Sequence, residues 1–403
     1  MRIKLGVIFG GETVEHEVSI ISAVQAMENI NEEKYEVIPI YIDKNRVWYT
    51  GNMLRDMSIY RDMDLLKRYA KEVVLYKKNG EFVLQNVNGM FKKVVNTLDV
   101  VLPIVHGQNV EDGSLAGYLD TLGIPYAGPS IMGAAIGQDK VTMKEVFKAN
   151  NLPIVPYLWF YDVEYNSNKE SILKDIKKLG YPVIVKPARL GSSVGIKVAK
   201  TQEEVEESIN DAIAYDEKII VEKVIDNLVE VNCSVLGNYE YTEASVLEEV
   251  TSKSDLLTYQ EKYMGGGKGK LKGGFKNASK MSSKGMASAK RKIPATIGDK
   301  LTKEVQDLSK EVFRVLNLSG VCRIDFLIDG KNKKAYINEP NTIPGSLSFY
   351  LWDASGKNYT ELLDEIITLA IRNYKNRDKK THSFDTNILS NYGGVKGMKG
   401  KLK

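Results

Sequence analysis

The first 120 residues alternate between short apolar runs and segments in which apolar positions recur every three or four residues. The run IKLGVIF (3–9) ends at the glycine pair Gly10–Gly11, and the wider spacing follows over 14–30. Apolar runs return at 35–43 and 99–107, and the wider spacing returns at 114–123. A run bounded by glycine predicts a buried strand, whereas the wider spacing predicts an amphipathic helix. Strands that alternate with helices predict a parallel α/β sheet, which binds ligands at the carboxyl ends of its strands.

The pattern changes after about residue 139, where predicted strands follow one another in pairs. The runs YPVIVKPA and IKVAK are joined by the loop LGSSVG, which predicts a hairpin. Further pairs are predicted at 230–238 with 239–250, and at 321–329 with 334–341. Helical spacing occupies 140–151, 168–179, 202–215, 301–317 and 358–374. The predicted fold class is therefore α/β, with an α+β C-terminal part.

The composition is that of a globular protein, with 43% apolar and 27% charged residues. The first apolar run is too short for a signal peptide, and no run of 18 apolar residues predicts a membrane helix. Cys233 and Cys322 lie in apolar runs, which predicts buried free thiols rather than a disulfide. We therefore expect a cytoplasmic location and no membrane partner.

Positive charge is concentrated in two segments. Residues 265–292 hold eight lysines, one arginine and seven glycines without an acid, and residues 377–403 hold seven basic and two acidic residues. Because the whole chain has a formal charge of only +4, the remainder is acidic. The glycine-rich segment alone is compatible with a nucleic-acid-binding arm or with a solvated linker. The tail from about residue 377 lacks periodicity, and we expect it to be disordered.

Acidic and amide side chains recur on the strand pair at 321–329 and 334–341. Alternate residues of a strand share a face, so Asp325 follows Arg323 on one side, and Asn341 follows Glu339. Carboxylate and amide oxygens are the ligands that Mg²⁺ prefers. A solvated hairpin face is the alternative, but the intervening apolar residues predict burial, and buried acids need a partner. The pattern favours a metal site that holds phosphates.

Three other motifs are weaker when each is taken alone. VIVKPARLGSSVG places Lys186 before a loop whose backbone N–H groups suit phosphate binding, although such loops are also common as turns. VEK (221–223) ends an apolar strand. GGETVEHEVS places Glu15 in the first turn of a helix, where it stabilises the helix dipole, and His16 suits a structural histidine as well as a functional one. The glycines lack GxGxxG spacing, which disfavours a nicotinamide site.

The order of these motifs resembles that of the ATP-grasp D-alanine–D-alanine ligases. GGETVEHEVS, HGQNVEDG, VKPARLGSSVG, VEK, EKY, RIDF and NEPNTIPG follow one another between about residues 3 and 375. The resemblance implies an ATP-grasp fold with an N-terminal Rossmann-like parallel-sheet domain. The implied parts are an N-terminal substrate domain at 1–125, a central subdomain at 126–224, a C-terminal subdomain at 225–376 with a mobile lid at about 255–295, and a basic disordered tail at 377–403.

The resemblance also implies the residues of the site. The positions that match ATP-binding residues are Lys140, Lys186, Ser192, Ser193, Glu222, Lys223, Ile225, Glu230 and Lys262. The positions that match ligands of two Mg²⁺ ions, for which Mn²⁺ can substitute, are Asp325, Glu339 and Asn341. The implied catalytic residues are Glu15, Ser192, Tyr263, Arg323 and Gly345. The implied substrate-binding residues are Glu15, His106, Arg323, Gly345 and Ser346.

Two motifs depart from the family pattern. Val110 replaces a glycine in HGQNVEDG, and Tyr350 stands where better-known members carry a serine that binds the second substrate. Ser346 and Ser348 are alternatives for that contact, so the second substrate stays open between D-alanine and D-serine. Tyr263 in EKY resembles members that use an amine nucleophile rather than D-lactate.

The resemblance implies an ATP- and Mg²⁺-dependent ligase that joins two D-alanines through a D-alanyl phosphate for peptidoglycan synthesis, with D-serine as the alternative second substrate. It also implies a homodimer whose partners are D-alanine and ATP. The basic segment 265–292 directly follows EKY, which matches the start of the family lid. A flexible lid protects a water-sensitive intermediate, so we expect this segment to contact phosphates rather than nucleic acid.

Overall fold

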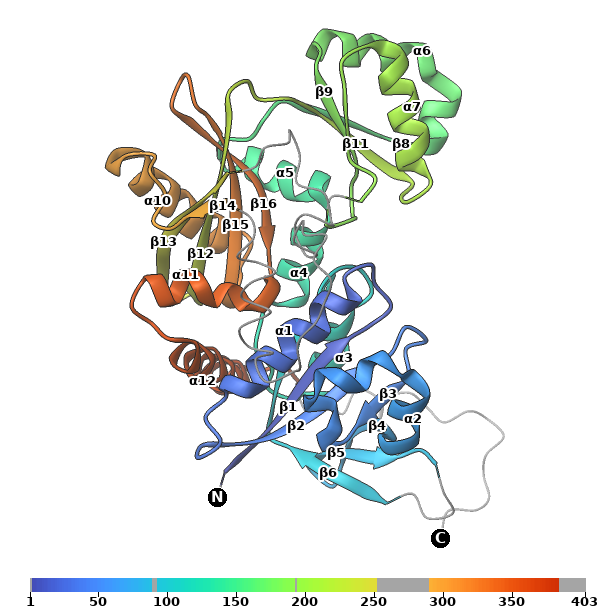
Figure 1. The fold of residues 1–403 in the computed structure, drawn as a ribbon, viewed down its shortest axis with the longest axis vertical. Helices are drawn as coiled ribbons and strands as arrows, with labels where there is room; N and C mark the ends of the chain where they lie inside the picture. Colours follow the sequence, from blue (N-terminus) through green and yellow to red (C-terminus); the bar gives the residue numbers. More distant parts are fainter. Residues whose placement is uncertain (1, 89–92, 193, 252–289, 384–403) are drawn as a thin grey trace, which may run out of the picture.

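Three sheets, with helices around them, make up the part of the chain that the computed structural model describes, residues 2–88, 93–192, 194–251 and 290–383 (Figure 1). The N-terminal sheet lies at one end of the molecule and a small four-stranded sheet at the other. Helices α4 and α5 lie between them (Figure 1). The predicted mixture of α/β and α+β parts is confirmed.

The N-terminal sheet has seven strands in the order β6-β5-β4-β3-β2-β1-β7. β1 pairs in parallel with β2 and β7, as the alternation of strands and helices predicts, whereas the other neighbours are antiparallel. The strands are β1 (Ile3–Gly10), β2 (Tyr35–Ile42), β3 (Trp48–Thr50), β4 (Lys71–Lys78), β5 (Glu81–Asn86), β6 (Val94–Leu98) and β7 (Val100–Ile104). The helices are α1 (His16–Asn29), η1 (Asn52–Arg55), η2 (Met57–Arg61), α2 (Met63–Tyr69) and α3 (Ser114–Leu122).

The central part contains a four-stranded antiparallel sheet in the order β10-β9-β11-β8. The predicted hairpin across the glycine- and serine-rich loop is the β9–β10 pair. The strands are β8 (Tyr157–Tyr161), β9 (Val183–Pro187), β10 (Lys197–Ala199) and β11 (Lys218–Lys223). The helices are α4 (Ile131–Gln138), α5 (Lys140–Ala149), α6 (Asp162–Leu179) and α7 (Gln202–Ile213).

The C-terminal part contains a five-stranded antiparallel sheet in the order β14-β13-β12-β15-β16. Both strand pairs predicted there are confirmed, as β12–β13 and β15–β16. The strands are β12 (Leu228–Gly237), β13 (Thr242–Thr251), β14 (Lys290–Lys292), β15 (Gly320–Asp329) and β16 (Lys334–Asn341). The helices are α10 (Asp299–Val315), η3 (Gly345–Ser348), α11 (Phe349–Ala354) and α12 (Tyr359–Asp378).

Each sheet has its own hydrophobic core, and the C-terminal helix joins the first of them. The buried apolar face of α12, including Leu362 and Ile366, belongs to the same core as Leu5 and Val100 of the N-terminal sheet. The chain therefore returns to the N-terminal part after it completes the five-stranded sheet, and it crosses the middle of the molecule on the way. The segment 342–348, which leads into that return, reaches the functional site described below.

The predicted buried free thiols are confirmed, because Cys233 and Cys322 are both buried and unpaired with each other. Within the described ranges, none of the helices combines the length and the apolar character that a membrane crossing requires.

Candidate functional site

The β15–β16 hairpin gathers acidic and amide groups on one face. Antiparallel pairing places Asp325 opposite Glu339 and Arg323 opposite Asn341. The Arg323 guanidinium donates through Nε and Nη2 to both oxygens of Asp325, at 2.7 and 2.8 Å. Asn341 Nδ2 also donates to Asp325 Oδ2, at 3.1 Å. The strand period predicts this convergence, and the register confirms it.

Burial makes this arrangement electrostatically strong. Burial alone would lower the pKa of Arg323, but the adjacent Asp325 carboxylate outweighs it and holds that pKa well above its ordinary value. Arg323 therefore carries a fixed positive charge beside the carboxylates. Because bulk water is largely excluded from this position, such a charge interacts strongly with any negative charge that a ligand brings.

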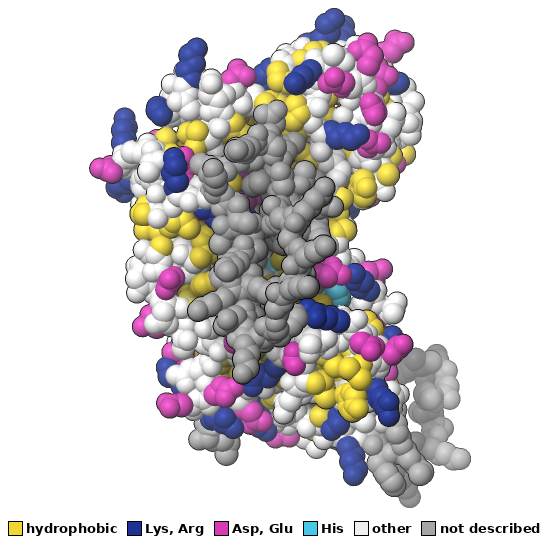
Figure 2. All heavy atoms as spheres, viewed as in Figure 1, with side chains coloured by type: hydrophobic (Ala, Val, Ile, Leu, Met, Phe, Trp, Pro, Cys, Tyr) yellow, Lys and Arg dark blue, Asp and Glu magenta, His cyan; other side chains and the backbone are white. Residues whose placement is uncertain are grey.

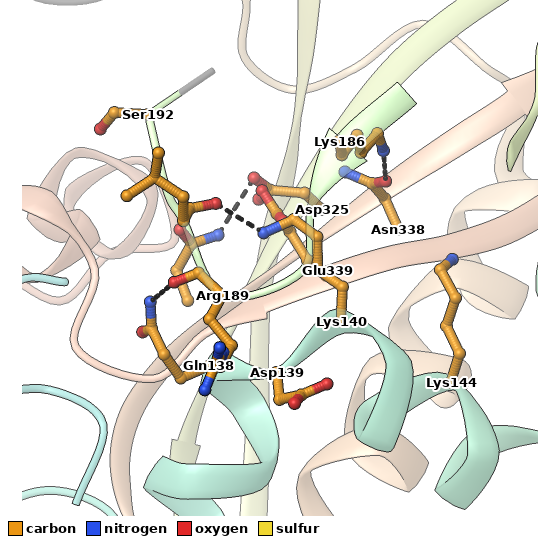
Figure 3. A network of polar contacts seen from close by, with 12 residues as sticks. Gln138, Asp139, Lys140, Lys144, Lys186, Arg189, Ser192, Asp325, Asn338 and Glu339 are labelled. Atoms are coloured by element: carbon orange, nitrogen blue, oxygen red, sulfur yellow. Dashed lines mark hydrogen bonds and ion pairs between the residues drawn. The ribbon is translucent and has the colours of Figure 1, made fainter. Parts of the chain in front are cut away.

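Two buried lysines approach the same face from the central part. Lys140 is the first residue of α5, and its ammonium lies 3.3 Å from Glu339 Oε2 and donates to the Leu190 carbonyl at 2.9 Å (Figure 3). Lys186 is on β9 and donates to Glu222 Oε2 at 2.7 Å. The two cations thus lie on the central part and the acids on the C-terminal part, so a ligand with phosphates and metal would bridge them.

Glu222 lies between two lysines. Its Oε2 accepts from Lys186, and its Oε1 lies 3.0 Å from the Lys144 ammonium. Burial would raise the pKa of Glu222, but the two ammonium groups lower it to about 2. Burial likewise opposes the charge of Lys186, yet Glu222 and Glu339 raise its pKa, whereas burial dominates at Lys144 and lowers its pKa. Each carboxylate oxygen of Glu222 therefore lies within 3.0 Å of an ammonium group.

Glu15 and Ser192 lie in contact although 177 positions separate them in the chain. The Ser192 hydroxyl donates to Glu15 Oε1. A side chain at either Gly107 or Gly191 would place its Cβ 2.9 Å from Glu15 Oε2, and Gly107 also has a positive φ of 82°. The two glycines therefore leave room for the Glu15 carboxylate between two loops. Tyr263, the third member of the predicted set, lies outside the described residues, as do Ser193, Lys262 and most of the predicted lid.

These residues line two adjoining cavities. The first is lined by, among others, Lys186, Glu222, Lys223, Ile225, Glu230, Asp325 and Tyr350. The second is lined by, among others, Val18, His106, Glu111, Thr342 and Gly345. Both cavities share Glu15, Lys140, Gly191, Ser192, Arg323, Glu339 and Asn341. Among the predicted residues that the structure describes, those that line the first cavity alone are Lys186, Glu222, Lys223, Ile225, Glu230 and Asp325, and those that line the second alone are His106 and Gly345. Glu15, Lys140, Ser192, Arg323, Glu339 and Asn341 lie where the two cavities meet, whereas Ser346 lines neither of them.

His106 and Ser22 brace the loop that carries Gly345. His106 Nδ1 lies 2.8 Å from the Ile343 carbonyl, which only accepts, so Nδ1 carries the hydrogen. Its Nε2 then accepts from the Ser22 hydroxyl at 3.2 Å, and Ser22 Oγ accepts from the Ser346 N–H at 2.9 Å. Burial lowers the pKa of His106 to about 4, which keeps the ring neutral. His106 therefore holds the loop in place and lines the second cavity.

Glu111 braces the same loop from another side. Its Oε2 accepts from the Gly107 N–H, and its Oε1 accepts from the Thr342 hydroxyl and the Ile343 N–H, each at 2.9 Å. Burial raises the pKa of Glu111 to about 7, and the nearby Glu15 charge adds to the effect. Further along the same loop, Ser346, Leu347 and Ser348 have positive φ values of 49°, 52° and 51°, which cost a non-glycine residue free energy.

The Glu111→Gln variant is expected to differ from the wild type in the pH dependence of its stability. The folded protein keeps a proton on Glu111 up to about pH 7, whereas the unfolded chain releases it near 4.5. The stabilising contribution of this group is therefore complete below about pH 4.5 and is lost as pH rises through about 7. Glutamine cannot ionise, so the variant gains stability relative to the wild type as pH rises.

Thermal unfolding midpoints of both proteins, measured from about pH 5 to pH 8.5, test this expectation. The exposed Glu33→Gln variant is the control, and its difference from the wild type should stay constant. A constant difference for Glu111→Gln as well would contradict the expectation.

The two departures from the family motif have local explanations. Val110 packs against Gly11, where an added Cβ would lie 2.6 Å from Val110 Cγ1, so the valine is accommodated by a glycine of the first motif. Tyr350 lines the first cavity and donates to Glu248 Oε2 at 2.8 Å. Ser346 and Ser348, the predicted substitutes for the missing serine, are buried at 2% and 0% exposure.

Sequence reasoning did not single out several residues of the site. Ser22 and Glu111 hold the loop that carries Gly345, and Lys144 lies beside Glu222. Arg291 is a further such residue, and its Nε lies 3.1 Å from Glu248 Oε1. Lys144 follows Lys140 by four residues in a helical pattern, which was the one signal available. The others depend on contacts between distant segments. His16, for which two roles were open, is a buried histidine that contacts the Gly11 carbonyl and the Tyr41 hydroxyl.

The predicted metal site relies on an amide as well as on acids. Among the described residues, no three His, Cys, Asp or Glu side chains gather as metal ligands, so two carboxylates and Asn341 form the candidate set. Rotation of the Asn341 amide would turn its oxygen toward the cation, and all ligand atoms of the set would then be oxygens. Hard cations prefer such a set. Arg323 already occupies Asp325, so a cation must share this carboxylate with the guanidinium. The set fits Mg²⁺ in chemistry and position.

Two family models match most of the chain. The model of the D-ala D-ala ligase N-terminus matches residues 4–129, and that of the D-ala D-ala ligase C-terminus matches residues 146–368. A D-alanine–D-alanine ligase of Thermosipho melanesiensis is 39% identical over 96% of this chain and 98% of its own. One of Thermoanaerobacter sp. is 36% identical over 93% of this chain and 98% of its own.

Solved structures agree with the family models. The D-alanine–D-alanine ligase of Coxiella burnetii superposes with a TM-score of 0.76 and 27% identity, over 94% of this chain and 96% of that one. The VanG D-Ala:D-Ser ligase of Enterococcus faecalis superposes with a TM-score of 0.74 and 28% identity, over 92% of this chain and 100% of that one. The similarity thus extends to nearly the whole length of each protein.

Proposed function

The chain belongs to the D-alanine–D-alanine ligase family, and from this premise we propose that it joins two D-alanines at the expense of ATP. The observation that carries the proposal is the meeting of two cavities at Arg323, Glu339 and Asn341. One cavity suits a nucleotide and the other suits a small amino acid, so the γ-phosphate and a substrate carboxylate would meet between them. The product, D-alanyl-D-alanine, serves peptidoglycan synthesis.

The reaction has two steps. In the first step, a carboxylate oxygen of one D-alanine attacks the γ-phosphorus of ATP, the bond to the β-phosphate oxygen breaks, and ADP leaves. In the second step, the amine of another D-alanine attacks the carbonyl carbon of the D-alanyl phosphate, which releases phosphate and a proton. Both steps spread negative charge over phosphoryl oxygens, which positioned cations stabilise.

The nucleotide would occupy the first cavity. Lys140 and Lys186 present buried ammonium groups to its phosphates. Lys223 donates to the Gly180 and Tyr181 carbonyls at 2.8 and 3.2 Å, which fixes the strand end where the adenine would bind. The remaining predicted contacts are Ser192, Ser193, Glu222, Ile225, Glu230 and Lys262.

The metal would be held by Asp325, Glu339 and Asn341. Bound Mg²⁺ would neutralise charge on the phosphate oxygens and polarise the phosphorus for attack. Two ions, with Mn²⁺ as a substitute, are proposed by family resemblance. Arg323, fixed by Asp325, holds a positive charge beside the transferring phosphoryl group.

The first D-alanine would occupy the second cavity. Glu15, which accepts a hydrogen bond from Ser192, would accept another from its ammonium group. Gly345 also lines this cavity, and His106 holds the loop of Gly345 by donating to the Ile343 carbonyl. We propose that Tyr263 completes the Glu15–Ser192 set and that the lid at about 255–295 excludes water from the acyl phosphate.

Incubating the purified protein with ATP, Mg²⁺ and D-alanine is expected to release one phosphate for each D-alanyl-D-alanine formed. The stoichiometry follows because every dipeptide requires one acyl phosphate. Phosphate release and dipeptide formation are measured in the same reactions, with L-alanine as the control. Absence of dipeptide, or phosphate release without dipeptide, would contradict the proposal.

D-serine is the second candidate for the second substrate. Tyr350, Glu248 and Arg291 line the first cavity as a polar cluster, and a hydroxyl group would find partners there. The similar VanG protein is a D-Ala:D-Ser ligase. Competition between D-alanine and D-serine for the second position, read by mass spectrometry of the products, decides between them.

Several further features are proposed from the family resemblance. They are a homodimer, a cytoplasmic location, no nucleic-acid or membrane partner, and the domain boundaries 1–125, 126–224 and 225–376. On the face drawn in Figure 2, basic and acidic side chains of the described residues are interspersed, and this gives no support for a nucleic-acid surface there.

A further inference from the structure

We propose that Lys144 is a positioning residue for nucleotide binding, which acts on the phosphates through Glu222 and Lys186. The inference rests on the proposed function, because it assigns Lys186 to the phosphates of ATP. Lys144 itself is not among the residues that line either cavity. Its effect would therefore pass through the side chains between it and the ligand.

Lys144 belongs to a buried chain of three charged side chains, together with Glu222 and Lys186. It lies on α5 one turn after Lys140 (Figure 3), and 1% of its side chain is exposed. Its ammonium is 3.0 Å from Glu222 Oε1. Glu222 is equally buried, and its other oxygen accepts from Lys186 at 2.7 Å. The Tyr157 ring covers the Lys144 ammonium at 5.8 Å from the ring centre.

The charges of this chain do not cancel. Two ammonium groups and one carboxylate leave one net positive charge, and Lys186 is the lysine of the three groups that faces the first cavity. Without Lys144, the single carboxylate would neutralise Lys186. Because the groups are buried, this difference of one charge is weakly screened and would be felt by a bound phosphate.

The same contacts fix the position of Lys186. Each lysine occupies a different oxygen of Glu222, so the carboxylate cannot rotate without losing a contact. Lys186 Nζ also lies 3.5 Å from Asn338 Oδ1, on the strand that carries Glu339. Lys144 thus holds the carboxylate, and the carboxylate holds the ammonium that faces the phosphates.

The test compares ADP with adenosine, which has the same base and ribose but no phosphates. Lys144→Met keeps the length of the side chain, removes its charge, and leaves Glu222 paired with Lys186. We expect its affinity for ADP to fall roughly tenfold to a hundredfold, the range for the loss of one charged contact, whereas its affinity for adenosine stays unchanged. Lys148→Met, an exposed lysine one turn further along α5, is the matched control and should bind both ligands as the wild type does.

Inhibition constants of ADP and adenosine against ATP provide these affinities in the ligation assay. Lys144→Arg, which keeps the charge, should restore most of the ADP affinity. An unchanged ADP affinity, or an equal loss of ADP and adenosine affinity, would overturn the proposal. If Lys144→Met does not fold, Lys144→Gln retains a hydrogen-bond donor for Glu222 without the charge and is judged by the same two constants. Failure of the proposed function itself would show in the wild type, independently of these variants.

Discussion

The Asp325→Asn variant is expected to lower kcat by a factor of about 10²–10³, the typical cost of removing one group that stabilises charge in a transition state. Asp325 receives both donors of Arg323 and the amide of Asn341, and it lies opposite Glu339 in the hairpin. Asparagine loses the charge that holds Arg323 and weakens the candidate metal site. Two sources of positive charge at the phosphoryl group are therefore disturbed together.

The measurement is kcat from phosphate release at saturating ATP and D-alanine, repeated over a range of Mg²⁺ concentrations. We expect the Mg²⁺ concentration for half-maximal rate to rise as well. Asp329→Asn is the matched control, because this residue lies on the same strand and accepts hydrogen bonds from the turn at its far end. A kcat within a factor of three of the wild type for Asp325→Asn would show that the hairpin acids do not serve the reaction.

The hairpin acids could be predicted because the relevant information is local. Asp325 and Glu339 lie on two consecutive strands joined by a short turn, so the strand period and the pairing direction suffice to bring them together. The same holds for the β9–β10 hairpin. Where the contacting residues lie close in sequence, pattern and geometry predict the contact.

The brace around the substrate loop could not be predicted in this way. Ser22, His106 and Ser346 come from three distant segments, and their hydrogen bonds depend on how the N-terminal sheet and the C-terminal part meet. The triad of Lys144, Glu222 and Lys186 likewise spans α5, β9 and β11. Motif order alone indicated that some of these segments meet, but it did not indicate which atoms touch.

Strands β3 to β6 were missed for a different reason. Each of these strands mixes buried residues with exposed or partly exposed ones, as the positions along β4 show. Their sequences therefore lack the continuous apolar runs that identify β1 and β7. The parallel pairing was predicted from the apolar runs of β1, β2 and β7, and antiparallel strands extend the sheet beyond β2.

The Trp352→Ala variant is expected to lower the free energy of unfolding by about 3–5 kcal/mol, the usual cost of truncating a large buried aromatic side chain. Trp352 is 0% exposed, and its indole N–H donates to Ser234 Oγ at 2.9 Å. Ser234 in turn donates to the Cys322 carbonyl at 3.1 Å, next to Arg323. The variant leaves a cavity and removes the first hydrogen bond of this series.

The Trp352→Phe variant separates the contribution of packing from that of the hydrogen bond to Ser234. Phenylalanine keeps an aromatic ring but cannot donate to Ser234, so its cost should be smaller than that of alanine, about 1–3 kcal/mol. Guanidinium unfolding curves give the values, and Trp159→Ala, at a tryptophan that is 39% exposed, is the control with an expected change under about 1 kcal/mol. If Trp352→Ala and the control were equally stable, the expected stabilising role of Trp352 would be contradicted.

The outcome bears on the segment SLSFYLW, whose sequence departs from better-known members of the family. If Trp352 stabilises the fold as expected, the unusual sequence at the end of this segment serves the packing of the protein beneath the site. Tyr350 is then the residue of the segment that faces the first cavity. Trp352→Phe should then keep the wild-type preference between D-alanine and D-serine while it loses stability. A changed preference in that variant would instead connect the packing of α11 to the choice of the second substrate.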